Sequence, residues 1–108
     1  MTLNEYQELA RRTINGKLRR AETLRHSLFG MCGELGEIHS IYQKVYQGHQ
    51  IKREELKKEI GDLLWFVAEL CTVNGFALDE IAQMNIDKLK ARYPAGFDAD
   101  HSLHRGND

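Results

Sequence analysis

Two short acidic motifs lie at the centre of this chain: ELGE at residues 34–37 and EIGD at residues 59–62. Each motif places two carboxylates three residues apart, and such residues share one face of an α-helix. Four carboxylates converging from two helices repel one another unless a cation neutralises them. An oxygen-only acidic cluster suits Mg²⁺, with Mn²⁺ as the alternative. The motifs therefore predict a divalent-metal site between two helices, with the ligands Glu34, Glu37, Glu59 and Asp62.

The apolar pattern predicts that both motifs border a buried face. At about 100° per residue, each helix has one apolar stripe, and the acids lie on its shoulder, where an unpaired charge is costly. The stripe of the first motif's helix consists of Leu28, Met31, Leu35, Ile38, Tyr42 and Val45. The stripe of the second consists of Leu56, Ile60, Leu63, Val67 and Leu70.

Four glycines accompany the acids, namely Gly30, Gly33, Gly36 and Gly61. A glycine inside a helix costs about 0.5–1 kcal/mol relative to alanine. Close approach of the two helix backbones would explain this cost and would bring the carboxylates together. On spacing alone, a solvated acidic rim on an ordinary helical bundle remains an alternative.

Helical periodicity extends over most of the chain and predicts an all-α domain. A capping box of Thr2 and Glu5 opens the first helix. The expected helices cover residues 2–14, 22–47, 52–74 and 78–93. No stretch alternates with the period of a strand, so no sheet is expected. Residues 95–108 are expected to form a tail or short turn, anchored to the bundle by Phe97.

The two motifs, separated by 21 residues, resemble the ExxE…ExxD signature of MazG-type nucleoside triphosphate pyrophosphohydrolases, in the all-α NTP pyrophosphatase superfamily. The opening LNEYQ at residues 3–7 is similar to the family's first helix. The stretch NIDKLKARYP at residues 85–94 is similar to its closing helix. The resemblance implies a four-to-five-helix bundle completed by dimerisation, with a catalytic domain over residues 1–94 and a tail over 95–108.

The resemblance also implies a reaction: Mg²⁺-dependent hydrolysis of a (deoxy)nucleoside triphosphate to the monophosphate and pyrophosphate, by attack at the α-phosphorus. Its implied role is nucleotide-pool housekeeping. All four acids are then catalytic as metal ligands, and Glu37 is the candidate base. Phosphoribosyl-ATP is an alternative, narrower substrate. A rival from another class is a non-catalytic helical dimerisation module.

Substrate contacts are expected from two further places. Asn85, Lys88 and Arg92 are three to four residues apart and share a helix face. Their amide and two cationic groups could contact the phosphates or the sugar of a nucleotide. The alternative is that the basic residues only complement the dipole at the helix C-terminus. By resemblance, Asn85 and Lys88 match positions that contact the nucleotide. Trp65 is a candidate for stacking on the base, with a place in the core as the alternative.

Composition limits the possible partners and the location of the protein. A formal net charge of −1 argues against a nucleic-acid polymer as partner. No apolar run approaches the roughly 20 residues of a membrane span, and no secretory signal opens the sequence. Cys32 and Cys71 are expected to be buried, reduced thiols, which agrees with a cytoplasmic location. A homodimer or a dimer of dimers is expected, since four helices of unequal length bury little alone.

Overall fold

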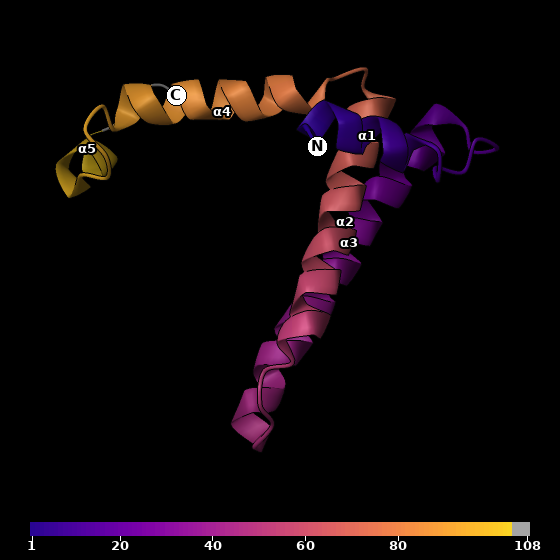
Figure 1. Ribbon diagram of the computed structural model, residues 1–108, viewed down its shortest axis with the longest axis horizontal. Coiled ribbons are helices and arrows are strands. Elements are labelled where there is room, and N and C mark those ends of the chain that lie inside the picture. The colour runs from indigo at the N-terminus through magenta and orange to yellow at the C-terminus, as the bar shows by residue number, and fades with distance from the viewer. Residues whose placement is uncertain (105–108) are drawn as a thin grey trace.

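The structure is a computed structural model that describes residues 1–104 (Figure 1). Its elements are α1 (Leu3–Arg11), α2 (Arg20–Gln43), the 3₁₀ helix η1 (Lys44–Gln47), α3 (Arg53–Val73), α4 (Leu78–Arg92) and α5 (Ala99–Leu103). No strand occurs in this part of the chain, and one isolated bridge joins Pro94 to Gly96. The all-α prediction is confirmed.

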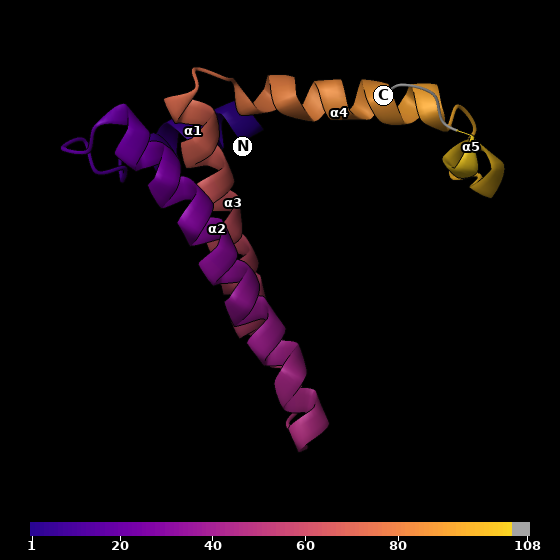
Figure 2. The ribbon, with the colours of Figure 1, turned by 180° about the vertical axis from the view of Figure 1, so that it is seen from behind.

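The two longest helices, α2 and α3, form an antiparallel hairpin (Figures 1 and 2). At the tip of the hairpin, α2 tightens into η1 instead of continuing as an α-helix to residue 47 as expected. Gly48 ends η1 with a φ of 91°, a left-handed conformation that a residue without Cβ adopts without strain. The backbone N–H of His49 then donates to the carbonyl of Lys44 at 3.0 Å. This turn redirects the chain toward α3.

The short helix α1 crosses the open end of the hairpin (Figure 1). The predicted capping box is present, with Glu5 N–H donating to Thr2 Oγ1 and Thr2 N–H donating to Glu5 Oε1. The helix ends at Arg11, earlier than expected, because residues 12–14 turn away toward α2. Where α1, α3 and α4 meet, a small core forms from Ala10, Ala68, Cys71 and Leu78, with Tyr6, Trp65 and Val67 packed against it. Cys71 is thus buried as expected, whereas Cys32 on α2 is exposed, so the expected burial is wrong for Cys32.

Gln7 of α1 fixes the direction in which α4 leaves the hairpin. Its side-chain Nε2 donates to the carbonyl of Phe76 at 2.8 Å and to Thr72 Oγ1 at 3.2 Å. Its Oε1 accepts from the backbone N–H of Leu78 at 2.8 Å. The axes of α3 and α4 differ by 103°, so α4 extends away from the hairpin (Figures 1 and 2). A buried glutamine therefore sets the angle between the two halves of the molecule.

The apolar stripe expected to be buried on α2 is largely exposed, which corrects the prediction. Its exposed members include Leu28, Leu35, Tyr42 and Val45. The α2 residues that are buried are instead Thr23, Ser27 and Ile41. The reason is that α3 packs against the shoulder of the stripe, where small side chains and the acids lie. The stripe itself is left without a partner in one chain.

The segment after α4 also differs from the expected tail or turn. It contains α5, which begins with Asp98 accepting from the N–H of Asp100 at 2.8 Å. Phe97 is 79% exposed. Among the aromatic rings of residues 1–104, it contacts only that of Tyr93, with centroids 5.4 Å apart. It therefore does not anchor the segment to the hairpin. The last four residues of the expected tail, 105–108, are outside the described part of the chain.

Over the described residues, no single helix is long and apolar enough to cross a bilayer. Only α3 and α4 taken together meet the criteria of length and composition, as a bent pair.

Candidate metal centre

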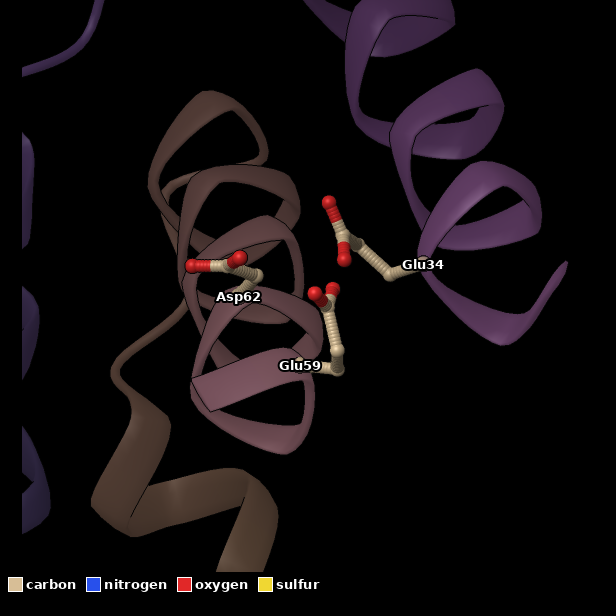
Figure 3. Close-up of side chains that lie close together, drawn as sticks. All are labelled: Glu34, Glu59 and Asp62. Carbon is tan, nitrogen blue, oxygen red and sulfur yellow. The ribbon is translucent and has the colours of Figure 1, made fainter. Parts of the chain in front are cut away.

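Three of the four predicted ligands lie together in the seam between α2 and α3. Glu34 reaches across from α2 toward Glu59 of α3, and Asp62 lies one turn further along α3 (Figure 3). Each contributes a carboxylate oxygen to a group whose members are all within 4.8 Å of one another. We call these three residues the acidic cluster. Helical spacing places Glu59 and Asp62 on the same face, while the antiparallel pairing of α2 with α3 brings Glu34 opposite them.

The electrostatic cost of this arrangement is concentrated on Glu34. The pKa of its carboxyl group is raised from 4.5 to about 7. The largest cause is the hydrogen bond with Glu59, which requires a proton between the two carboxyl groups. Burial adds to the shift, followed by the negative charges of Asp62, Glu59 and Glu37. Without a cation, the seam therefore retains a proton near neutral pH.

The fourth predicted ligand, Glu37, is exposed and lies outside the acidic cluster. It is nevertheless near enough for its charge to raise the pKa of Glu34. One turn of helix separates the two residues, so both face the same side of α2. The structure thus gives Glu37 a place beside the acidic cluster.

The residues present are suited to a divalent cation. The Oε2 atom of Glu34 is buried and has no hydrogen-bond partner in the described chain. An unsatisfied buried carboxylate oxygen is costly, and a cation would satisfy it. The donor set contains only carboxylate oxygens, the ligands that Mg²⁺ and Mn²⁺ prefer. Glu34, Glu59 and Asp62 would hold the ion.

Of the four glycines, only Gly30 explains a close approach between the helices. A Cβ at this position would overlap the ring of Phe66. At Gly33, Gly36 and Gly61, an added Cβ would meet no atom of residues 1–104 within 4 Å. Phe66 follows Asp62 by one turn of α3, so its ring fills the seam directly beside the acidic cluster. The expectation that all four glycines permit backbone contact is wrong for three of them.

A second polar group in the seam was missed by the sequence analysis. Glu69 is only 1% exposed. Its carboxylate accepts from Ser27 Oγ at 2.8 Å, and its two oxygens lie 2.8 and 3.1 Å from Nδ1 of His26. Glu69 follows Asp62 by seven residues, two helical turns, and this spacing was the available signal. The seam is therefore polar over several turns, with the ring of Phe66 between its two acidic parts.

Trp65 is held at the junction with α1. Its Nε1 donates to Thr13 Oγ1 at 2.8 Å, and its ring packs against the small core. The ring of its neighbour Phe66 packs edge-to-face against it, with centroids 5.1 Å apart, and lies against Gly30 in the seam. These contacts agree with the structural alternative for Trp65, and they make Phe66 the aromatic residue beside the acidic cluster.

The predicted substrate-contacting residues on α4 are distant from the acidic cluster of the same chain. Asp62 lies eleven residues before the end of α3, while Asn85, Lys88 and Arg92 lie seven or more residues into α4. With 1.5 Å rise per residue and the observed bend, these separations place the α4 residues on the order of 20 Å from the cluster. Asn85 and Lys88 are exposed, and the guanidinium of Arg92 lies over the ring of Tyr93 at 5.9 Å.

The fold and the acidic cluster define an all-helical domain with a carboxylate site suited to a divalent cation. The domain family described as MazG nucleotide pyrophosphohydrolase matches residues 1–97. The chain therefore belongs to the MazG nucleotide pyrophosphohydrolase family, and the resemblance noted from its motifs is confirmed.

The chain is also similar to a protein of a bacteriophage. It is 32% identical over 80 residues to the Gene 37 protein of Mycobacterium phage L5, an alignment covering 69% of this chain and 70% of that protein. That name gives no activity. No solved structure shows a significant match.

Proposed function

We propose that this protein hydrolyses (deoxy)nucleoside triphosphates to the monophosphate and pyrophosphate, with a divalent cation held by Glu34, Glu59 and Asp62. The observation that carries the proposal is the acidic cluster itself, in which the buried Oε2 of Glu34 has no hydrogen-bond partner among the described residues. Membership of the MazG family supports nucleotide pyrophosphohydrolysis as the reaction. Mg²⁺ is the proposed ion, with Mn²⁺ as the alternative.

The chemistry requires an attacking water, a base and a neutralised triphosphate. A divalent ion, when bound, neutralises phosphate charge and makes its bound water more acidic. Attack forms a bond from the water oxygen to the α-phosphorus and breaks the bond from that phosphorus to the bridging oxygen of the leaving pyrophosphate. The water's proton passes to a carboxylate. We assign this role to Glu37, whose carboxylate lies beside the acidic cluster and outside it.

The proposal requires a second copy of the chain, because the residues proposed to bind phosphate are too distant from the acidic cluster within one chain. The exposed α2 stripe offers an apolar contact surface, and α4 extends away from its own hairpin (Figure 1). We propose a homodimer, or a dimer of dimers, in which Asn85, Lys88 and Arg92 of one copy face the acidic cluster of another. Residues 1–94 would form the catalytic domain, acting in the cytoplasm in nucleotide-pool housekeeping.

The test is product identity by phosphorus NMR, using a panel of NTPs and dNTPs with Mg²⁺ and including phosphoribosyl-ATP. We expect monophosphate and pyrophosphate as products, and their loss in Glu59→Gln. Glu80→Gln, at an exposed acid on α4, is the matched control and should retain activity. Diphosphate with orthophosphate would contradict attack at the α-phosphorus. No turnover of any nucleotide would favour a non-catalytic dimerisation module.

A further inference from the structure

The tip of the α2–α3 hairpin contains a small cavity of about 70 Å³. It is lined by Ile41, Lys44, His49, Gln50, Lys52 and Glu55. We call it the basic hollow, because three of its six lining residues carry basic side chains. A cavity needs about 10–15 Å³ of such volume to hold one water molecule, so the basic hollow has room for several waters or for phosphate groups.

The turn at Gly48 builds this cavity. The left-handed conformation of Gly48 and the bond from His49 N–H to Lys44 O bring His49 back over η1. Lys52 follows as the N-cap of α3, and its side chain makes no capping hydrogen bond. Ile41, which is buried, forms an apolar wall. Three separate parts of the backbone therefore deliver Lys44, His49 and Lys52 to one place.

The charges around the basic hollow are not already paired. In the part of the chain that the structure describes, Lys44, His49 and Lys52 have no ion pair. Glu55 is the single acid in the lining and also has no such partner. Two lysines thus face one carboxylate, in a protein whose formal net charge is −1. A local excess of positive charge around a small concave space favours an anion.

The position of the basic hollow relates it to the acidic cluster. Lys52 precedes Glu59 by seven residues, a rise of about 10 Å, and Lys44 follows Glu34 by ten residues, about 15 Å. A triphosphate whose α-phosphorus lies at the acidic cluster would extend its terminal phosphates along the seam toward these lysines, and their flexible side chains would cover the remaining distance. Lysine ammonium groups bind phosphate as point charges.

We propose that the basic hollow binds the terminal phosphates of the nucleotide and retains the pyrophosphate leaving group. This rests on the proposed function for the choice of ligand. It assigns Lys44, His49 and Lys52 a binding role, whereas the phosphate contacts considered so far lie on α4. Glu55 weakens anion binding at this site and so favours release of the product.

The first experiment uses the 108-residue chain, inorganic pyrophosphate and EDTA, so that no metal at the acidic cluster contributes to binding. Affinity is measured by calorimetry and the site by amide NMR shifts. We expect the largest shifts between residues 44 and 55. Lys44→Gln with Lys52→Gln should weaken binding by about tenfold or more, since charge-assisted hydrogen bonds to phosphate are lost. Lys57→Gln with Lys90→Gln removes the same charge elsewhere and should change affinity by less than about twofold.

The Glu55→Gln variant provides an independent test, through the direction in which it changes the affinity for pyrophosphate. If the basic hollow binds an anion directly, removing this carboxylate should tighten pyrophosphate binding several-fold, on the order of one surface charge interaction. Weaker binding in Glu55→Gln would overturn the proposal, because it would show that the carboxylate helps to hold the ligand. Amide spectra of each variant establish that the fold is retained.

The outcomes separate this proposal from the proposed function. Pyrophosphate bound at residues 44–55, without cleavage of any nucleotide, would support the basic hollow as an anion site and contradict the enzymatic activity. Nucleotide cleavage, with pyrophosphate shifts confined to α4 or equal affinity in the double lysine variant, would overturn the basic hollow and leave the activity standing.

Discussion

Glu34 combines three properties in one carboxylate: an inward position on α2, an oxygen without a hydrogen-bond partner in the described residues, and a pKa of about 7. The folded-state pKa lies above the ordinary value of 4.5, so the folded protein without metal binds more protons than the unfolded chain between these values. Its contribution to stability is therefore fully present below pH 4.5 and is lost as the pH rises to about 7.

The first prediction concerns Glu34→Gln. At about pH 8, the metal-free variant should melt a few degrees above the wild type, because charge repulsion in the acidic cluster is relieved. At about pH 5 the two should differ much less. Mg²⁺ should raise the melting temperature of the wild type and not of the variant. Thermal unfolding with and without EDTA measures both effects, with Glu80→Gln as control. Equal Mg²⁺ stabilisation of both proteins would exclude Glu34 as a ligand.

The second prediction uses the contrast between two glycines of α2. Gly30→Ala should destabilise the protein by about 1–3 kcal/mol, because the added methyl overlaps the ring of Phe66. Gly33→Ala adds the same methyl where no atom lies within 4 Å. It should stabilise the helix by about 0.5–1 kcal/mol. Denaturant unfolding compares them, and Gly30→Ala combined with Phe66→Leu should recover part of the loss. Equal effects at both positions would contradict the close packing.

At the scale of elements, α1 acts as a clamp between α3 and α4. Gln7 joins the end of α3 to the start of α4, and Asn4 Oδ1 accepts from the N–H of Asp79 at 2.9 Å. Side chains of α1 thus supply the capping acceptors that Ala77, at the N-cap of α4, lacks.

The third prediction follows from this clamp. Gln7→Ala should lower the free energy of unfolding by about 2–3 kcal/mol, because the buried N–H of Leu78 and the carbonyl of Phe76 both lose their partner. Hydrogen exchange at the start of α4 should accelerate more than exchange in the α2–α3 hairpin. Gln7→Glu keeps the acceptor for Leu78 but loses the donor for Phe76, so it should protect Leu78 better than alanine does. Uniform acceleration in all helices would show that Gln7 stabilises the whole domain without setting the α4 angle.

At the scale of the whole molecule, one chain leaves much apolar surface uncovered. The α2 stripe and α4 are exposed on elements that diverge by a large angle, and the principal extents of 46 × 44 × 28 Å describe an open shape. Burial of such surface is favourable by about 25 cal/mol per Å², which supports association with a second copy.

The fourth prediction is therefore an oligomer whose site contains residues from two copies. Light scattering should give about two or four times the chain mass. Leu28→Asp with Tyr42→Asp, on the exposed stripe, should yield monomers with little activity. Leu9→Asp changes an equally exposed leucine of α1 and should leave the oligomer intact. A fully active wild-type monomer would contradict the shared site.

Mixing two inactive variants tests the contribution of α4 across copies. Glu59→Gln removes a proposed metal ligand, and Lys88→Ala removes a proposed phosphate contact. Random reassembly into dimers would restore about a quarter of the sites if the two residues act from different chains. Restoration would not occur if both residues had to belong to the same chain.

The sequence alone determined the helical class, the positions of the main helices and the two acidic motifs, because helical periodicity, capping residues and i,i+3 spacing are local properties. It did not determine which face of α2 would be covered, since apolar periodicity identifies a stripe without naming its partner. The α3 helix packs on the acidic shoulder, so Glu34 is half-buried while Leu35 is exposed.

Only the tertiary structure decided the relations between distant residues. It placed Glu37 outside the acidic cluster, limited close packing to Gly30, and brought Glu69 into contact with Ser27 across the seam. It also directed α4 away from the hairpin through the contacts of Gln7. Each of these depends on how two helices cross, and a crossing is fixed by the fit of side chains far apart in sequence, which no local pattern contains.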